Sequence, residues 1–336
     1  MMDRDLSEQN SRGPIELLAE SFLDEIIEFV KLIPFVERFV PVLALVVMSR
    51  PIIMAVAAIT PASAAFLANN GIPPIKESLL ALICLCLAVA SAHIVNDFCD
   101  AEVDRINRRT QLRPIVLGLV SKKTAIIVGV LLSILSLIIA FFINLTCVLL
   151  LAAGILLIFT YSAKLKQTQI GFLPPALAAF LLPPGAFAVY DPARAFCSVS
   201  LVVGLAGFFF ELVPYWSQTL PDIEGDRARK LKTISVCYGE RKAALSILLS
   251  FAACFFFLVY LYKLAALSMP YLLFTVIGGG ILAIFLLWFI ARPNPRNAII
   301  SYFSSLFFIG IISLIIIAEK ALPELIEIWH QLLVIR

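Results

Sequence analysis

The sequence predicts an all-α, polytopic membrane protein. Of its 336 residues, 61% are hydrophobic and only 15% are charged, whereas soluble domains carry about 25% charged residues. The mean hydropathy is +1.00, and apolar segments recur at the roughly 20-residue length that a helix needs to cross a bilayer. This composition excludes a soluble globular enzyme and indicates one membrane domain.

The N-terminal region is predicted to stay on the cytoplasmic side. Residues 1–12 are polar and mix acids with bases, which is not the pattern of a secretory signal. Residues 14–38 alternate acidic and apolar positions, which predicts an amphipathic helix lying in the membrane interface. The apolar stripe of that helix consists of Leu18, Phe22, Ile26 and Val30.

Nine membrane-length segments follow this region. Only Asn144 separates the third segment from the fourth, which predicts a tight helical hairpin. The residues after 318 are predicted to form a second interfacial helix. The predicted organisation is therefore an N-terminal region over 1–47, a nine-helix domain over 48–318 and an amphipathic tail over 319–336. The predicted spans are 52–69, 78–96, 124–143, 145–161, 172–190, 198–218, 244–262, 271–291 and 298–318.

Lysine and arginine are distributed unequally between the two sides of this arrangement. With nine spans and a cytoplasmic N-terminus, only five of the 26 basic residues fall on the outer side. Positive residues accumulate in cytoplasmic loops, so the asymmetry supports both the span count and the orientation. The five outer residues are Lys76, Arg194, Lys263, Lys320 and Arg336.

Two acidic motifs interrupt the apolar sequence at the cytoplasmic ends of the second and sixth spans. Asn96, Asp100 and Asp104 are four residues apart, as are Asp222 and Asp226, so each set lies on one face of a helix. Carboxylates beside a bilayer are costly and indicate a functional site. Oxygen ligands stacked at this pitch suit Mg²⁺, which is usually shared with substrate phosphates.

Basic residues surround both acidic motifs. Acid beside base at a membrane surface fits Mg²⁺ that bridges carboxylates to a polyanion whose other oxygens bind arginine and lysine. A diphosphate fits best, because its two phosphates can span two metal sites. An allylic diphosphate is also a leaving group, and the carbocation left behind needs a dry cavity. These basic residues are Arg105, Arg108, Arg109, Arg113, Arg227, Arg229, Lys230 and Lys232.

The two motifs together resemble those of the UbiA superfamily of intramembrane prenyltransferases. The similar features are Asn96 to Asp104 followed by Arg113-Pro114, and the segment from Pro221 to Thr233. The stretch from Tyr161 to Lys166 resembles the Tyr/Lys element of that family, and either Lys164 or Lys166 is the equivalent lysine. Arg50-Pro51 before the first span is also similar. The resemblance covers roughly residues 48–318.

The resemblance implies nine transmembrane helices around a central cavity, capped by cytoplasmic Asp-rich loops. It implies Mg²⁺-dependent transfer of an isoprenyl chain from its diphosphate to an aromatic or other lipophilic acceptor among the membrane lipids. No nucleic acid and no obligate protein partner is expected. Asn96, Asp100, Asp104, Asp222 and Asp226 would hold Mg²⁺ and diphosphate, and the four aspartates would be catalytic. Diphosphate would also bind Arg105, Arg113, Lys164, Lys166 and Arg227.

Four further polar residues have roles that the sequence leaves open. Arg50 and Glu211 are possible acceptor-binding residues, and Glu211 is either an acceptor contact or a carboxyl packed against another helix. Glu211 precedes Asp222 by about three helical turns, which could bring both to one cavity. Asp97 lies about 100° from the Asn96–Asp100 face and is expected to orient its neighbours. His93 is expected to be a hydrogen-bonded packing residue.

Alternative functions are a cyclase of prenyl diphosphates, a secondary transporter and a non-catalytic isoprenoid scaffold. Transporters also place Asp and Glu in paired halves, but at the bilayer midplane and beside broken helices. The sequence does not identify the acceptor. The acceptors and products of the family that it resembles include quinone precursors, chlorophyll, haem O, tocopherols, archaeal ether lipids and cell-wall lipid sugars.

Overall fold

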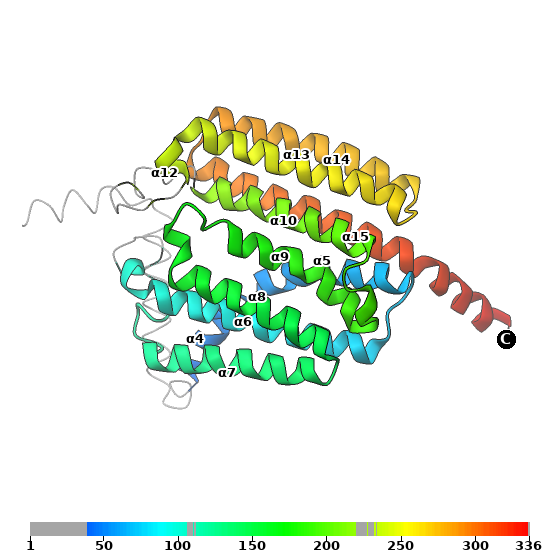
Figure 1. The fold of residues 1–336 in the computed structure, drawn as a ribbon, viewed down its shortest axis with the longest axis horizontal. Helices are drawn as coiled ribbons and strands as arrows, with labels where there is room; N and C mark the ends of the chain where they lie inside the picture. The colour runs from blue at the N-terminus through cyan, green and yellow to red at the C-terminus, as the bar shows by residue number, and fades with distance from the viewer. Residues whose placement is uncertain are drawn as a thin grey trace, which may run out of the picture.

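The computed structural model describes residues 39–105, 110, 112–219, 227, 232 and 234–334. Within these ranges the regular structure is entirely helical, as predicted, and long helices run side by side in one bundle (Figure 1). The predicted interfacial helix over 14–38 lies outside the described residues, as does the second acidic motif.

The helices follow the predicted order of spans with small changes at their ends. Their bounds are α4 Val40–Met48, α5 Pro51–Asn69, α6 Ile75–Asp104, α7 Lys122–Phe141, α8 Leu145–Ala163, α9 Leu173–Tyr190, α10 Ser198–Thr219, α12 Ile234–Tyr238, α13 Glu240–Leu264, α14 Met269–Ala291 and α15 Pro295–Val334. Short 3₁₀ helices at Leu165–Gln167 and Pro192–Arg194 precede and follow α9.

The predicted multi-span architecture is confirmed by helix length and composition. Among the described residues, eight helices, α6 to α10 and α13 to α15, are long and apolar enough to cross a membrane. α5, with 19 residues, occupies the position of the first predicted span. The total of nine spans stays a prediction.

The hairpin predicted at Asn144 is confirmed. Asn144 is the N-cap of α8, and its side-chain oxygen accepts a hydrogen bond from the backbone N–H of Cys147. Its amide nitrogen donates to the carbonyl of Ala188 in α9 at 2.7 Å. A cap side chain that also reaches a neighbouring helix fixes both the turn and its packing.

The predicted start of a separate tail helix at residue 319 is wrong. α15 runs without a break from Pro295 to Val334, and Pro323 lies inside it. No glycine or proline separates the last span from residue 319, so nothing in the local sequence ends the helix there. The far part of α15 projects from the bundle (Figure 1).

The helices that lead into the two acidic motifs do not pack directly against each other. α6 packs against α7 and α8, whereas α10 packs against α9, α13 and α15. α5 and α9 each contact both α6 and α10. This is the arrangement expected of two helices that face a shared interior space.

Candidate active site

The last two turns of α6 carry three buried carboxylates. Asp97, Asp100 and Asp104 are only 3%, 9% and 4% exposed. The helix continues eight residues beyond the predicted end of the second span, so the first acidic motif is helical, as its spacing predicted. Three carboxylates this close and this buried require positive partners.

Arg113 is the cation shared by all three carboxylates. Its Nη1 lies 2.7 Å from an oxygen of Asp104, 3.1 Å from Asp97 and 3.6 Å from Asp100. The arginine comes from the loop between α6 and α7, where the next residue, Pro114, is buried. A single guanidinium thus holds the loop against one face of α6.

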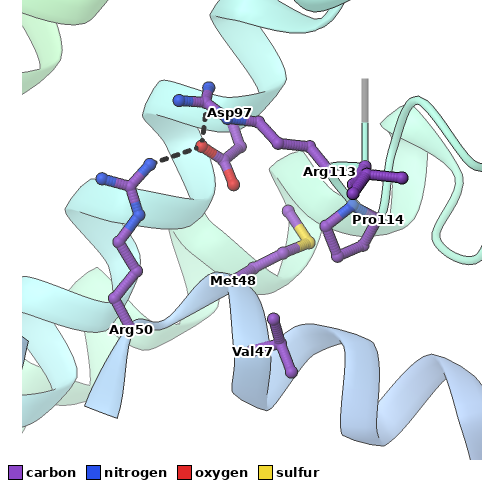
Figure 2. A pocket seen from close by; sticks show the side chains of 7 residues that line it. Val47, Met48, Arg50, Asp97, Arg113 and Pro114 are labelled. Carbon is purple, nitrogen blue, oxygen red and sulfur yellow. Dashed lines mark hydrogen bonds and ion pairs between the residues drawn. The ribbon is translucent and has the colours of Figure 1, made fainter. Parts of the chain in front are cut away.

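Arg50 approaches the same cluster from the start of α5. Its Nη2 is 3.0 Å from Asp97, so Asp97 is bound by two arginines from different elements (Figure 2). Arg50 is the N-cap of α5 and has a left-handed backbone with φ 53°, which is rare before proline and marks a constrained site. The cavity beside it is about 220 Å³ in volume, with apolar walls from Val47, Met48, Leu112 and Pro114.

Lys166 is the third basic group of the cluster. Its ammonium pairs with Asp100, whereas Lys164 is exposed. Of the two lysines that the sequence left open, only Lys166 therefore contacts the first acidic motif. Asn96 donates to Asp100 at 3.1 Å and accepts from Ser162 of α8 at 3.4 Å. These bonds connect the end of α6 to the end of α8.

The loop that carries the second acidic motif returns to this end of the bundle. Asp222 and Asp226 lie outside the described residues. Lys232, six residues beyond Asp226, donates its backbone N–H to the carbonyl of Gln167 at 3.2 Å. Gln167 is next to Lys166, which contacts Asp100. The two ends of the second motif's loop, α10 and α12, thus lie on the same side as the first motif (Figure 1).

Further ionisable side chains lie near the acidic motif or near Glu211 of α10. Tyr161 of α8 lies within electrostatic range of both Asp100 and Glu211. Tyr302 of α15 lies within electrostatic range of Glu211 and Arg50. His93, one helical turn before Asp97, is in range of Arg50 and Arg113. Four helices therefore contribute ionisable groups to one region below the acidic motif.

The predicted role of His93 as a hydrogen-bonded packing residue stays a prediction. His93 is half-buried and makes no hydrogen bond to any described residue. Its two arginine neighbours could not be predicted, because Arg50 and Arg113 come from other elements.

Not every predicted site residue enters the cluster. Arg105 is exposed and lies 3.8 Å from Glu102, a neighbour on its own helix, rather than near the buried carboxylates. Arg227 is also exposed. Tyr302 was not predicted, because it carries no motif of its own and lies 75 residues from Arg227, the nearest predicted site residue in the sequence.

The chemistry of this end suits a divalent cation shared with an anion. Within the described residues, no three carboxylate, histidine or cysteine side chains form a metal-binding group. Arg113 and Lys166 are the present partners of Asp100 and Asp104. The hard oxygens of Asn96, Asp100 and Asp104 fit Mg²⁺, and a complete set of ligands requires carboxylates from a second segment. The second acidic motif of the chain contains two such carboxylates, Asp222 and Asp226.

Comparison with known proteins identifies relatives of the whole bundle. Residues 53–312 match the UbiA prenyltransferase family. A digeranylgeranylglyceryl phosphate synthase from Thermococcus sibiricus is 30% identical over 256 residues, which cover 74% of this chain and 87% of the relative. One from Methanoregula boonei is 33% identical over 210 residues, covering 61% and 68% of the two chains.

Solved structures have the same fold. A structure of a digeranylgeranylglyceryl phosphate synthase aligns with a TM-score of 0.69 at 18% identity, covering 83% of this chain and 98% of the other. A UbiA homologue from Archaeoglobus fulgidus bound to GPP and Mg²⁺ aligns with a TM-score of 0.58 at 19% identity, covering 82% and 99%.

Proposed function

The chain belongs to the UbiA prenyltransferase family, and we propose that it transfers an isoprenyl chain to the free hydroxyl of a glycerol-phosphate lipid. As a member of that family it is a multi-pass membrane enzyme that moves an isoprenyl chain from its diphosphate in a Mg²⁺-dependent reaction. The acceptor is the new element of the proposal. It is supported by the relatives from Thermococcus and Methanoregula, whose named product is a glyceryl phosphate with two geranylgeranyl chains.

The proposed diphosphate site lies at the end of α6. Asn96, Asp100 and Asp104 would hold Mg²⁺ together with Asp222 and Asp226, and the ion would neutralise the negative charge of the departing diphosphate. Lys166 and Arg113 already contact Asp100 and would exchange these contacts for phosphate oxygens. Arg105, Lys164 and Arg227 are exposed and form the outer members of the proposed set.

The observation that carries this assignment is the convergence of both motif regions on one place. Asp100 pairs with Lys166, and the neighbouring Gln167 bonds to the loop that follows the second motif. A diphosphate bound between the two motifs would be held from both sides. Its isoprenyl chain would extend into the apolar bundle, where water is scarce and a carbocation survives long enough to be attacked.

Arg50 is the proposed partner for the acceptor's phosphate. Its guanidinium shares Asp97 with Arg113, so two positive groups face a single carboxylate (Figure 2). The adjacent cavity has apolar walls from α4, and α4 exposes Val42, Leu43, Val46 and Val47. A phosphate with an alkyl chain matches a basic group beside an apolar surface.

The orientation forms part of the same proposal. The excess of lysine and arginine in the loops beside the ends of α6 and α10 supports a cytoplasmic position for both ends. Both substrates would then reach the site from the cytoplasm or from the inner leaflet.

Purified protein in vesicles tests the proposed reaction. The substrates are geranylgeranyl diphosphate and a glyceryl phosphate bearing one geranylgeranyl ether, with Mg²⁺ or with excess chelator. We expect a product with two ether chains that forms only with Mg²⁺. An aromatic quinone precursor serves as the competing acceptor. Transfer to the aromatic acceptor and none to the glyceryl phosphate would overturn the proposal.

Arg50→Gln sharpens this test when the acceptor is offered with and without its phosphate. The variant should raise KM for the phosphorylated acceptor by about 10-fold or more, as expected for loss of a charge-assisted contact. It should leave KM for the unphosphorylated analogue within a factor of about two of the parent. Equal effects on both acceptors would remove Arg50 from the phosphate site.

A further inference from the structure

Glu211 is a carboxyl group in a membrane-length helix that packs against α9, α13 and α15. From residue 199 to residue 217, no residue of α10 is exposed. Glu211 lies eight residues before the end of α10, about 12 Å into the bundle at 1.5 Å per residue. Its side chain nevertheless retains some accessible surface. The residues on either side of it, Phe210 and Leu212, pack in the hydrophobic core, so this surface faces the inside of the bundle.

Glu211 has no partner for its carboxyl group among the described residues. It makes neither a hydrogen bond nor an ion pair with them. The hydroxyl groups of Tyr161 and Tyr302 also make no hydrogen bond to a described residue. Both tyrosines lie within electrostatic range of Glu211. All three side chains are partly accessible, so their polar groups can bind a polar ligand. An ionisable group inside a membrane-spanning helix indicates a functional site.

The two tyrosines relate Glu211 to the residues of the proposed substrate sites. Tyr161 lies within electrostatic range of both Asp100 and Glu211. Tyr302 lies within electrostatic range of Glu211 and of Arg50, the proposed phosphate partner. Ser301, the neighbour of Tyr302, is 3.2 Å from Ser217 of α10, which fixes α15 against α10 at this level. A hydroxyl held by Glu211 would thus lie between the donor end and the acceptor's phosphate.

We propose that Glu211 is a catalytic residue that binds the acceptor hydroxyl and takes its proton, with Tyr161 and Tyr302 as positioning residues. The inference rests on the proposed function, because it requires an acceptor that reacts through oxygen. Any alcohol that becomes an ether must lose its proton. Glu211 is the only carboxyl group in the described part of the bundle that is both enclosed at this depth and without a partner.

The step balances in atoms and charge. The bond between the first carbon of the isoprenyl chain and the diphosphate oxygen breaks, and its electron pair leaves with the diphosphate. A lone pair of the acceptor oxygen forms the new carbon–oxygen bond. The hydroxyl proton passes to the Glu211 carboxylate, which releases it to water when the product leaves. Nothing is oxidised or reduced, and no further reactant is needed.

Glu211→Gln tests the inference, because glutamine keeps the shape of the side chain but cannot accept the proton. General-base catalysis contributes about 10²–10⁴-fold, so single-turnover transfer to the glyceryl phosphate acceptor should fall at least about 100-fold. Binding of geranylgeranyl diphosphate with Mg²⁺ should be unchanged, and cleavage of the diphosphate should shift from ether product to free prenyl alcohol. Glu319→Gln, at the opposite end of the bundle, is the matched control and should transfer at the parent rate.

A second variant covers the case in which Glu211→Gln does not fold. Glu211→Ala leaves room for a small carboxylate, and added formate should then raise transfer by about 10-fold or more. Formate should not rescue Asp100→Ala, because that variant lacks a proposed Mg²⁺ ligand and not the proposed proton acceptor. A side chain that only fills space would not be replaced by formate, so absence of rescue in folded Glu211→Ala overturns the inference.

The outcomes separate this inference from the proposed function. If the parent uses the glyceryl phosphate and Glu211→Gln transfers within about threefold of it, the inference fails and the proposed function stands. If the parent transfers only to carbon of the aromatic acceptor, the proposed acceptor fails, and the role of Glu211 at an acceptor oxygen fails with it.

Discussion

The two ends of the helical bundle both contain charged side chains, but these groups bind different partners. At the end of α6, charges pair with charges: Arg113 contacts Asp97, Asp100 and Asp104, and Lys166 contacts Asp100. These pairs join side chains from several elements. Each of them could be exchanged for an ion or a phosphate oxygen without unwinding a helix.

At the opposite end, charged side chains bind mainly the backbone and polar groups of loops. Glu319 of α15 accepts from the hydroxyl of Ser268 at 2.7 Å and from its N–H. Lys320 donates to Asn70 at 2.8 Å, and Arg194 donates to the carbonyl of Ala68 at 2.7 Å. Glu324 accepts from the N–H of Ile72 at 3.2 Å. The extended α15 thus fastens the α5–α6 and α13–α14 loops.

This difference separates function from stability. Backbone groups at helix ends need partners in every state of the protein, so the contacts at the α15 end are expected to be permanent. Carboxylates and guanidinium groups at the α6 end can change partners when a charged substrate arrives. Substitutions at the α6 end should therefore reduce turnover, and substitutions at the α15 end should reduce thermal stability.

The largest effect is expected at Asp100. Asp100→Ala removes a hard oxygen ligand and leaves Lys166 without its partner, so turnover should be abolished. Asp222→Ala should have the same effect, because the proposed site needs carboxylates from both motifs. Diphosphate release is the measurement, and an unchanged elution volume in detergent is the control for folding. Retention of more than about a tenth of the activity, a loss of only ~1.4 kcal/mol of barrier stabilisation, would count heavily against the site.

Arg113 and Arg194 form a matched pair across the two ends. Arg113→Gln should lower kcat/KM for the prenyl diphosphate by about 10- to 100-fold, the range expected for charged hydrogen bonds. Arg194→Gln should leave kcat/KM within a factor of about two and lower Tm instead. If Arg113→Gln altered only Tm, the arginine would hold the α6–α7 loop and have no part in binding diphosphate.

A smaller effect is expected where α15 fastens the loops. Glu319→Ala removes the acceptor for both donors of Ser268, and it should lower Tm by a few degrees, corresponding to about 1–2 kcal/mol. Glu327→Ala, about two turns further along α15 at an exposed position, should change Tm by less than about one degree. A loss of turnover in Glu319→Ala at a temperature where it stays folded would break the separation between the two ends.

The smallest perturbation is a label that tests which side each end faces. A membrane-impermeant maleimide should modify Leu117→Cys and the exposed native Cys237 from the cytoplasmic side. It should modify Ala193→Cys only from the opposite side, because Lys and Arg are concentrated beside the α6 end. A Cys237→Ser background controls for the native thiol. Labelling of Leu117→Cys and Cys237 from different sides would exclude one shared active site.

Much of the fold was predictable because it depends on local properties of the sequence. Length and hydropathy predicted the spans to within a few residues at most ends, and Asn144 predicted the hairpin between α7 and α8. The C-terminal tail could not be predicted from local properties in the same way. Residues after 318 have the composition of a separate interfacial helix, yet α15 continues through them, because Glu319, Lys320 and Glu324 bind loops that are distant in sequence.

The candidate site was predicted in part for the same reason. The four-residue spacing of Asn96, Asp100 and Asp104 is a property of one helix, so their common face could be inferred. The choice between Lys164 and Lys166 could not, because it depends on how the loop after α8 turns toward α6. Gly171 shows how closely that loop is packed: a methyl group there would lie 2.7 Å from the carbonyl oxygen of Leu165.

By itself, the sequence determined that this chain is a helical membrane protein with two acidic motifs at helix ends. Hydropathy, charge asymmetry and helical period are local properties. Each can be determined from residues that are close together in the sequence. Only the tertiary structure decided that Arg50 and Arg113 share Asp97, and that Tyr161 and Tyr302 lie near Glu211. Those contacts join residues far apart in the chain, and they depend on the relative positions of packed helices, which no local period specifies.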